Sequence, residues 1–171
     1  DVSFVFPNSP YVAMLITTLV ITHLSNKYSY NARILVSMGF ITATTIFIPI
    51  EAKMFQNSDF GMYLIMAVLF VMGFNNTLCY ASTAGLSSQI DAKYTGYFLI
   101  GVAIFGLVMN IVKEGVLLAF HPTDDADLQS ILVYFGITVF FLIVGFIVHI
   151  IFVRSEFYYV KVKMQRYAKD A

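Results

Sequence analysis

Five runs of apolar residues divide this sequence, and short polar connections separate them. Each run is close to the roughly 20 residues that an α-helix needs to cross about 30 Å of hydrocarbon in a bilayer. The runs are unbroken and lack the alternation of polar and apolar residues that marks the strands of a membrane β-barrel. In lipid, a backbone with this pattern satisfies its hydrogen bonds as helices. The sequence therefore predicts an all-α membrane protein with five transmembrane helices.

The connections between the runs are short, so successive helices are antiparallel. We expect the helices at residues 8–25, 33–50, 60–88, 94–113 and 131–153, followed by a polar tail at 154–171. Together they form a single transmembrane helical domain over residues 1–171. The first residue is Asp1 and not methionine, so we expect a fragment of a longer chain. None of the five predicted helices contains a carboxylate, so we expect no coupling ion.

Composition excludes several other classes of protein. Charged residues make up 12% of the chain and hydrophobic residues 59%, whereas a soluble domain carries about 25% charged and about 45–50% apolar residues. The formal net charge is zero, so overall electrostatic attraction gives no reason to expect binding to nucleic acid. Cys79 is the one cysteine and the three histidines are widely spaced, so we expect no disulfide, no metal site and no cofactor.

The distribution of basic residues predicts the orientation in the membrane. With five antiparallel helices, one side receives eight of the ten basic residues: Lys27, Arg33, Lys93, Arg154, Lys161, Lys163, Arg166 and Lys169. The other side receives Lys53 and Lys113 together with most of the acidic residues. An excess of lysine and arginine marks the cytoplasmic side of a membrane protein. The C-terminus is therefore expected on the cytoplasmic or matrix side.

The third predicted helix carries polar side chains at membrane depth. Asn76, Tyr80, Thr83 and Ser87 follow at intervals of four, three and four residues, so they share one helical face. Polar groups at this depth require partners on neighbouring helices or in a water-filled cavity. The face is therefore interpreted either as the wall of a substrate pathway or as a site of hydrogen bonds between helices, and the spacing favours neither.

The small residues Gly85, Gly101, Ala103 and Gly106 recur where helices approach each other closely, and we interpret them as packing positions. The sequence has no His-Glu-x-x-His pair, no paired carboxylates inside the predicted helices and no serine and histidine at matching depth. The pattern therefore does not indicate an enzyme.

Several short motifs resemble the equilibrative nucleoside transporter family. The segment from Ser82 to Leu86, then Tyr94-Thr95, then the small residues from Gly101 to Gly106, resembles the fourth and fifth helices of that family. Arg33-Ile34-Leu35 is similar to the start of its third helix. Arg154-Ser-Glu-Phe-Tyr158 is similar to the segment that leaves its sixth helix.

The resemblance implies that these five helices correspond to the second through sixth of a fold of eleven helices, arranged as six plus five in the manner of the major facilitators. It also implies that a nucleoside is held between the two halves and moved by alternating access. The implied partners are the lipid bilayer, a nucleoside or related small solute, and the missing half of the transporter or other membrane subunits.

The resemblance further implies which residues line the solute cavity. The positions that match the family are Tyr11 and Met14 on the first predicted helix, and Asn76, Tyr80 and Ser82 on the third. Thr83 joins them because it shares the polar face with Asn76 and Tyr80. Tyr80 and Val102 stand where the family usually has glutamine. The sequence thus predicts a nucleoside-transporter-like permease, and the alternative is a structural membrane subunit that has lost transport.

Overall fold

The computed structural model describes residues 11–21, 28–55, 59–119 and 126–163. Four helices in this part of the chain are long and apolar enough to cross a membrane: α2 (Tyr30–Met54), α3 (Asp59–Ile90), α4 (Ala92–Ala119) and α5 (Ala126–Arg154). A shorter apolar helix, Tyr11–Ile21, precedes them. The described residues contain no strand. The prediction of an all-α membrane protein is confirmed.

The four long helices extend beyond the apolar runs that predicted them. The Ser29 side chain caps the start of α2 by accepting a hydrogen bond from the backbone N–H of Ala32 at 3.4 Å. Hydropathy marks the stretch that fits the hydrocarbon, whereas a helix continues until its backbone groups find a cap. Consequently Glu51 lies within α2 and Glu114 within α4. The expectation that no helix contains a carboxylate is wrong for these two residues, and also for Asp59 in α3 and Asp127 in α5. Of the four, Glu51 and Glu114 lie within the candidate membrane spans.

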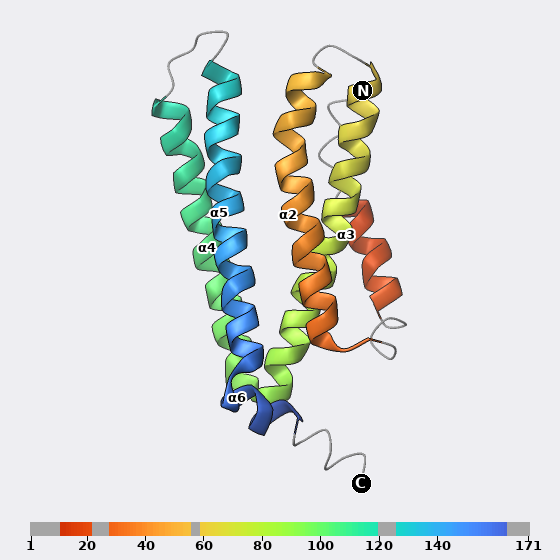
Figure 1. The fold of residues 1–171 in the computed structure, drawn as a ribbon, viewed down its shortest axis with the longest axis vertical. Helices are drawn as coiled ribbons and strands as arrows, with labels where there is room; N and C mark the ends of the chain where they lie inside the picture. The colour runs from red at the N-terminus through yellow and green to blue at the C-terminus, as the bar shows by residue number, and fades with distance from the viewer. Residues whose placement is uncertain (1–10, 22–27, 56–58, 120–125, 164–171) are drawn as a thin grey trace.

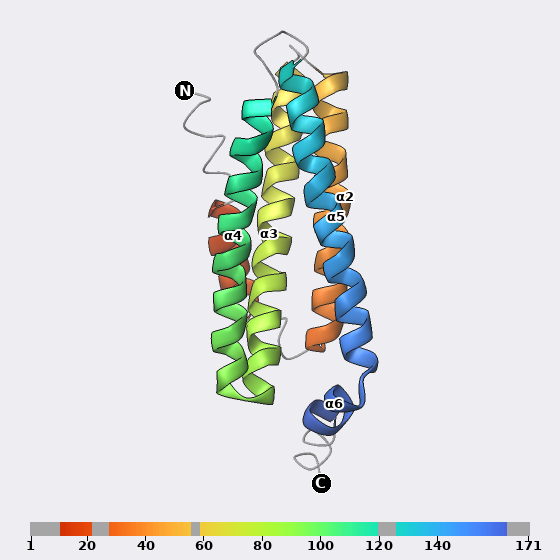
Figure 2. The same cartoon turned by 90° about the vertical axis from the view of Figure 1, so that its left-hand side faces the viewer.

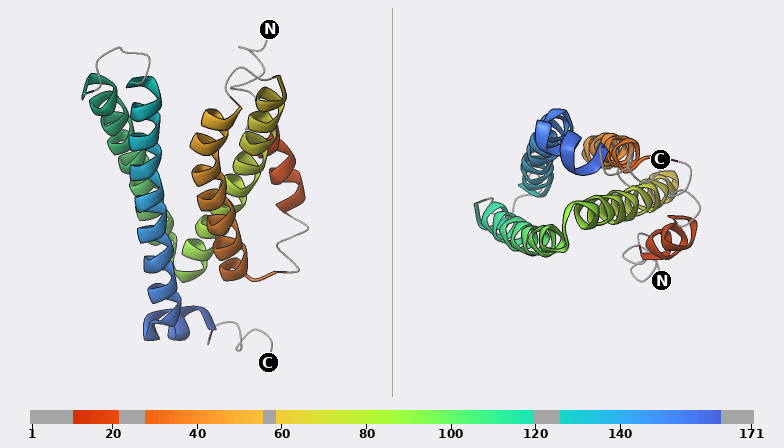
Figure 3. Two further views of the ribbon diagram at one scale, coloured as in Figure 1. Left: turned by 45° about the horizontal axis from the view of Figure 1, so that its top comes forward. Right: turned by 90° about the horizontal axis from the view of Figure 1, so that it is seen from below.

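The helices form two antiparallel pairs that stand beside each other. Figure 1 shows α2 beside α3 and α4 beside α5, and α2 also packs against α5 while α3 packs against α4. Seen from below in Figure 3, α5 and α2 form one row, α4 and α3 form a second row, and helix Tyr11–Ile21 lies beyond the end of the second row. Helix α3 therefore has both α2 and α4 as neighbours.

Most large apolar side chains face outward. Leu118 on α4 is 84% exposed and Leu19 on the first helix is 79% exposed. In a membrane protein the surrounding lipid is as apolar as leucine, so such exposure carries no hydrophobic penalty and helix association depends on close packing and hydrogen bonds. The contacts that matter are therefore the few buried ones.

The chain turns sharply after α5 and passes beneath the bundle. Ser155 leaves the helical conformation, with a ψ of 149°, and caps the short α6 (Glu156–Tyr158). A π-helical turn, η1 (Tyr159–Lys163), follows. Figure 2 shows α6 lying across the lower end of the structure. The buried Tyr158 joins Ile34 of α2 and Leu86 of α3 in one apolar cluster, so the segment after the last span is part of the folded bundle.

Candidate functional site

The polar face of α3 lies along its contact with α4. The rings of Tyr80 and Phe98 pack with centroids 5.2 Å apart. Nearer the turn between the two helices, the hydroxyl oxygens of Ser87 and Thr95 share a hydrogen bond at 3.4 Å. Figures 1 and 3 show that α3 and α4 meet at this turn and diverge toward the other end. Ser87 is thus at the joined end of the face, and Asn76 and Tyr80 lie further along α3.

Several polar side chains of α3 are satisfied by their own helix. The Thr83 hydroxyl donates to the Cys79 carbonyl oxygen at 2.8 Å, and the Asn75 amide nitrogen donates to the Val71 carbonyl oxygen at 2.9 Å. The Thr77 hydroxyl makes the same kind of bond one turn back. Such bonds remove the cost of a free donor in lipid without any neighbouring helix. Neither interpretation of the polar face included these hydrogen bonds from a side chain to a carbonyl oxygen of its own helix.

Asn76 and Tyr80 differ from their neighbours because their polar groups are free. Neither side chain has a hydrogen-bond partner among the described residues. Both are exposed, and Tyr80 is 43% exposed. Unpaired amide and hydroxyl groups cost about 1–3 kcal/mol each when they are removed from water. The arrangement leaves these two groups available to a polar solute or to water.

Ser82 lies on a different side of α3. It is completely buried, and its hydroxyl has no partner among the described residues. Leu78 and Leu86, each one turn away, share its face, and Leu86 packs with Ile34 of α2. The structure therefore does not bring Ser82 together with Asn76 and Tyr80, and its role in solute binding stays a prediction.

Tyr11 and Met14 lie on the short helix Tyr11–Ile21. Tyr11 is 63% exposed and Met14 is half-buried. Figure 3 places this helix beyond α3, away from α5. Its buried face consists of Ala13 and Thr17, each fully inaccessible, and the Thr17 hydroxyl donates to the Ala13 carbonyl oxygen at 2.7 Å. A solute contact of Tyr11 and Met14 also stays a prediction.

The comparison with known families decides the wider relationship. A family model described as nucleoside transporter matches residues 65–170, which is more than half of the chain. The chain belongs to the nucleoside transporter family. The matched residues include α4, α5 and most of α3, and with them the free polar groups of Asn76 and Tyr80. The resemblance drawn from the motifs is confirmed, and this is an integral multi-pass membrane protein of a transporter family. No curated protein and no solved structure matches the chain.

The four small residues assigned to helix packing lie in different surroundings in this transporter. A Cβ atom on Gly85 would lie 2.6 Å from Cε1 of Tyr30, so α2 and α3 approach closely there. A Cβ atom on Gly101 or Gly106 would meet nothing within 4 Å among the described residues, and Ala103 is exposed. Packing against those three positions on α4 stays a prediction that concerns other parts of the transporter.

Sequence reasoning missed the burial of Arg33. This arginine is 6% exposed, and its guanidinium carbon lies 4.6 Å from the centre of the Tyr30 ring. The signal was present in the sequence, because Arg33 stands at the start of an apolar run where a charged side chain has little water around it. Among the described residues, no group of three or more His, Cys, Asp and Glu side chains is placed to hold a metal ion.

Proposed function

We propose that this transporter moves a nucleoside or a similar small polar solute across the membrane, and that Asn76, Tyr80 and Thr83 border the solute pathway. Membership of the nucleoside transporter family supports the general role. The observation that carries the residue assignment is that Asn76 and Tyr80 hold free polar groups on an exposed face of a membrane helix. Such groups at membrane depth are rare unless they meet water, substrate or another polar group.

The chemistry of the face suits a nucleoside. Tyr80 offers an aromatic ring for stacking against a base and one hydroxyl for a hydrogen bond. Phe98 holds one side of the Tyr80 ring, which limits the orientations that the ring adopts. The Asn76 amide supplies a donor and an acceptor together. Tyr80 stands where the family usually has glutamine, so a single hydroxyl takes the place of the donor and acceptor of a glutamine amide.

The proposed mechanism is alternating access. The described helices form one bundle, and the exposed side of α3 and α4 forms one wall of the pathway. The other half of the transporter, which the family resemblance implies, supplies the opposite wall. Rocking of the two bundles exposes the solute first on one side of the membrane and then on the other.

Replacing Tyr80 with phenylalanine tests the assignment. The change keeps the ring and its contact with Phe98 but removes the hydroxyl. We expect the apparent affinity for solute to fall about tenfold, or about 1.4 kcal/mol, with the fold intact. Uptake of labelled nucleosides into proteoliposomes that contain the whole transporter measures this affinity. Replacing Asn76 with leucine should reduce uptake further, because it removes both halves of the amide pair.

Tyr63→Phe provides the matched control. Tyr63 also lies on α3 and is 65% exposed, but it lies near the opposite end of the helix from the Ser87–Thr95 contact. We expect this variant to transport like the wild type. Equal effects of the two substitutions contradict the role of Tyr80. No uptake by well-folded wild-type transporter, together with a face that a partner subunit covers, supports the structural alternative.

The proposed orientation places α6 on the cytoplasmic or matrix side. At that end the described residues include Arg33, Lys93, Arg154 and Lys161, whereas Lys53 and Lys113 lie at the other end. Cysteines introduced at Lys161 and at the exposed Leu118, with Cys79 replaced by alanine, test it in intact cells. We expect a membrane-impermeant maleimide to label the Leu118→Cys variant from outside. Labelling of the Lys161→Cys variant alone contradicts the orientation.

A further inference from the structure

Arg33 is a buried cation without a counterion in the described part of the chain. Among the described residues, its Nε has no hydrogen-bond partner and its guanidinium group forms no ion pair. The contact with the Tyr30 ring attracts the charge but leaves the N–H donors unfilled. A buried charge is costly unless it is paired and hydrogen-bonded. An anion bound beside the Arg33 guanidinium would remove this cost.

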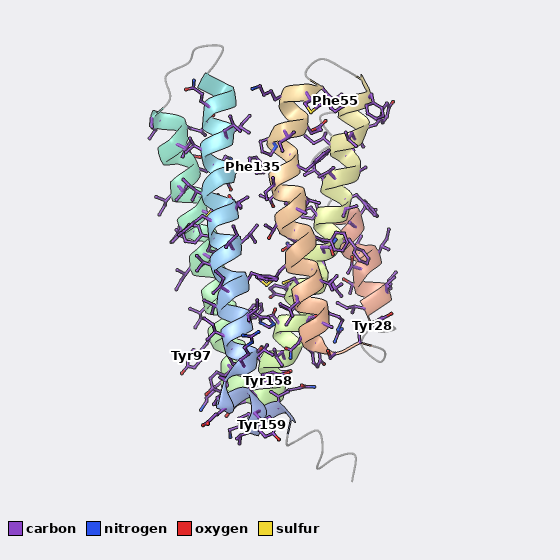
Figure 4. The ribbon with its side chains drawn as sticks, in the orientation of Figure 1. Tyr28, Phe55, Tyr97, Phe135, Tyr158 and Tyr159 are labelled. Carbon is purple, nitrogen blue, oxygen red and sulfur yellow. The ribbon has the colours of Figure 1, made fainter. Side chains whose placement is uncertain are left out.

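Arg33 lines a hollow of about 450 Å³ between α2 and α3. Val36 and Phe40 line it from α2, and Phe74 and Leu78 line it from α3. Tyr28, which Figure 4 shows beside the start of α2, also contributes to the wall. The volume falls in the range of about 300–1,000 Å³ that is usual for small-molecule sites. Val36 is 55% exposed and Phe40 is 53% exposed, so the hollow opens toward the surroundings of the bundle.

The hollow is charged at one end and apolar along its length. Arg33 lies in the first turn of the membrane-spanning part of α2, close to one membrane surface. Phe40 lies seven residues further on, about 10 Å deeper at 1.5 Å per residue. Asn75 also lines the hollow, but its amide nitrogen already donates to the Val71 carbonyl oxygen. The wall beyond Arg33 is therefore suited to hydrocarbon.

From this geometry we infer that the hollow binds an anionic phospholipid of the surrounding membrane. The lipid phosphate lies against the Arg33 guanidinium, which matches phosphate oxygens with two parallel N–H donors. One acyl chain runs inward along Val36 and Phe40 on one side and along Leu78 and Phe74 on the other. The phosphate stays at the depth of the membrane surface, and the acyl chain stays in the hydrocarbon. This site is separate from the polar face of α3 at Asn76 and Tyr80.

Native mass spectrometry of the whole transporter in mild detergent tests the site. Phosphatidylglycerol and phosphatidylcholine are added in turn, and the lipid that stays bound is counted. We expect phosphatidylglycerol to bind about tenfold more tightly than phosphatidylcholine. Val36→Trp fills the hollow without changing charge and should lower this affinity at least tenfold. Val148→Trp is the matched control, because Val148 on α5 is 58% exposed and lies outside the hollow.

Arg33→Gln should lower the affinity for phosphatidylglycerol to the level of the affinity for phosphatidylcholine. Lys93→Gln removes a cation at the same end of the bundle and should leave the affinity for phosphatidylglycerol unchanged. Lys93 already pairs with Asp91 at 3.8 Å. Undiminished phosphatidylglycerol binding by the Val36→Trp variant overturns the proposal, and so does equal binding of the two lipids by the wild type. Loss of stability in Arg33→Gln with unchanged lipid binding also overturns it, because the anion is then a carboxylate of the protein. If Arg33→Gln does not fold, the phosphatidylglycerol affinity of the Val36→Trp variant tests the proposal by itself.

Discussion

Replacing Tyr158 with alanine is expected to lower the free energy of unfolding by about 3–5 kcal/mol, the usual cost of removing a buried aromatic side chain. Tyr158 is 6% exposed, and its ring packs against Phe152 with centroids 5.6 Å apart. The Asn31 amide nitrogen donates a hydrogen bond to its hydroxyl oxygen. Figure 4 shows Tyr158 where α6 passes beneath the bundle. The substitution removes both the packing and the hydrogen bond that attach this segment to α2.

Thermal unfolding in detergent measures the loss of stability, and hydrogen exchange of residues 155–163 shows whether the segment detaches. Tyr158→Phe should cost about 1 kcal/mol, because it keeps the ring and removes the acceptor for Asn31. Tyr97→Ala is the control, since Tyr97 is 65% exposed and its described ring contact is with Tyr94. If Tyr158→Ala destabilises no more than Tyr97→Ala, the segment does not support the bundle.

Replacing Gly85 with alanine is expected to destabilise the transporter by about 1–3 kcal/mol, the usual cost of overpacking a close contact. The added Cβ would lie 2.6 Å from Cε1 and 3.1 Å from Cζ of Tyr30. The ring cannot move away freely, because the Arg33 guanidinium lies over it and the ring packs against the Ile34 cluster. Thermal unfolding measures the effect, and Gly85→Leu should abolish the contact between α2 and α3 at this point.

Gly39→Ala is the matched control for this change. Gly39 lies inside α2, and a Cβ there would meet nothing within 4 Å. Alanine should therefore stabilise the helix by up to about 1 kcal/mol, because glycine is the weaker helix former. The two substitutions are thus expected to have opposite signs. A Gly85→Ala variant as stable as Gly39→Ala contradicts the close approach, whereas rescue by Tyr30→Ala in the same chain supports it.

The polar face of α3 was predictable because helical periodicity is a local property. Residues that are three and four positions apart share a face in every α-helix, so Asn76, Tyr80 and Thr83 lie together whatever surrounds them. The same reasoning did not reveal that Thr83 is satisfied by the Cys79 carbonyl while Asn76 and Tyr80 remain free. It also did not separate Ser82 from this set, because burial depends on which helix covers each face.

The small residues also show that a sequence pattern does not reveal which positions are covered by another helix. Gly85 and Gly101 are both predicted packing positions, yet a Cβ on Gly85 would meet Tyr30, whereas a Cβ on Gly101 would meet no described residue within 4 Å. Composition marks positions where helices are able to approach, but the approach itself depends on residues distant in the sequence. The same holds for Asn31 and Tyr158, which are 127 positions apart.

By itself the sequence determined that this chain is helical and lies in a membrane, because the length and continuity of its apolar runs leave lipid-embedded helices as the structure that satisfies the backbone. Its motifs also predicted the family, which the match to the family model confirmed. The tertiary structure decided which polar groups are free, that Glu51 and Arg33 are buried, and that Tyr158 closes one end of the bundle. These properties depend on contacts between distant residues, and in lipid such contacts are selected by close packing and hydrogen bonding rather than by hydrophobicity, which the sequence displays most clearly.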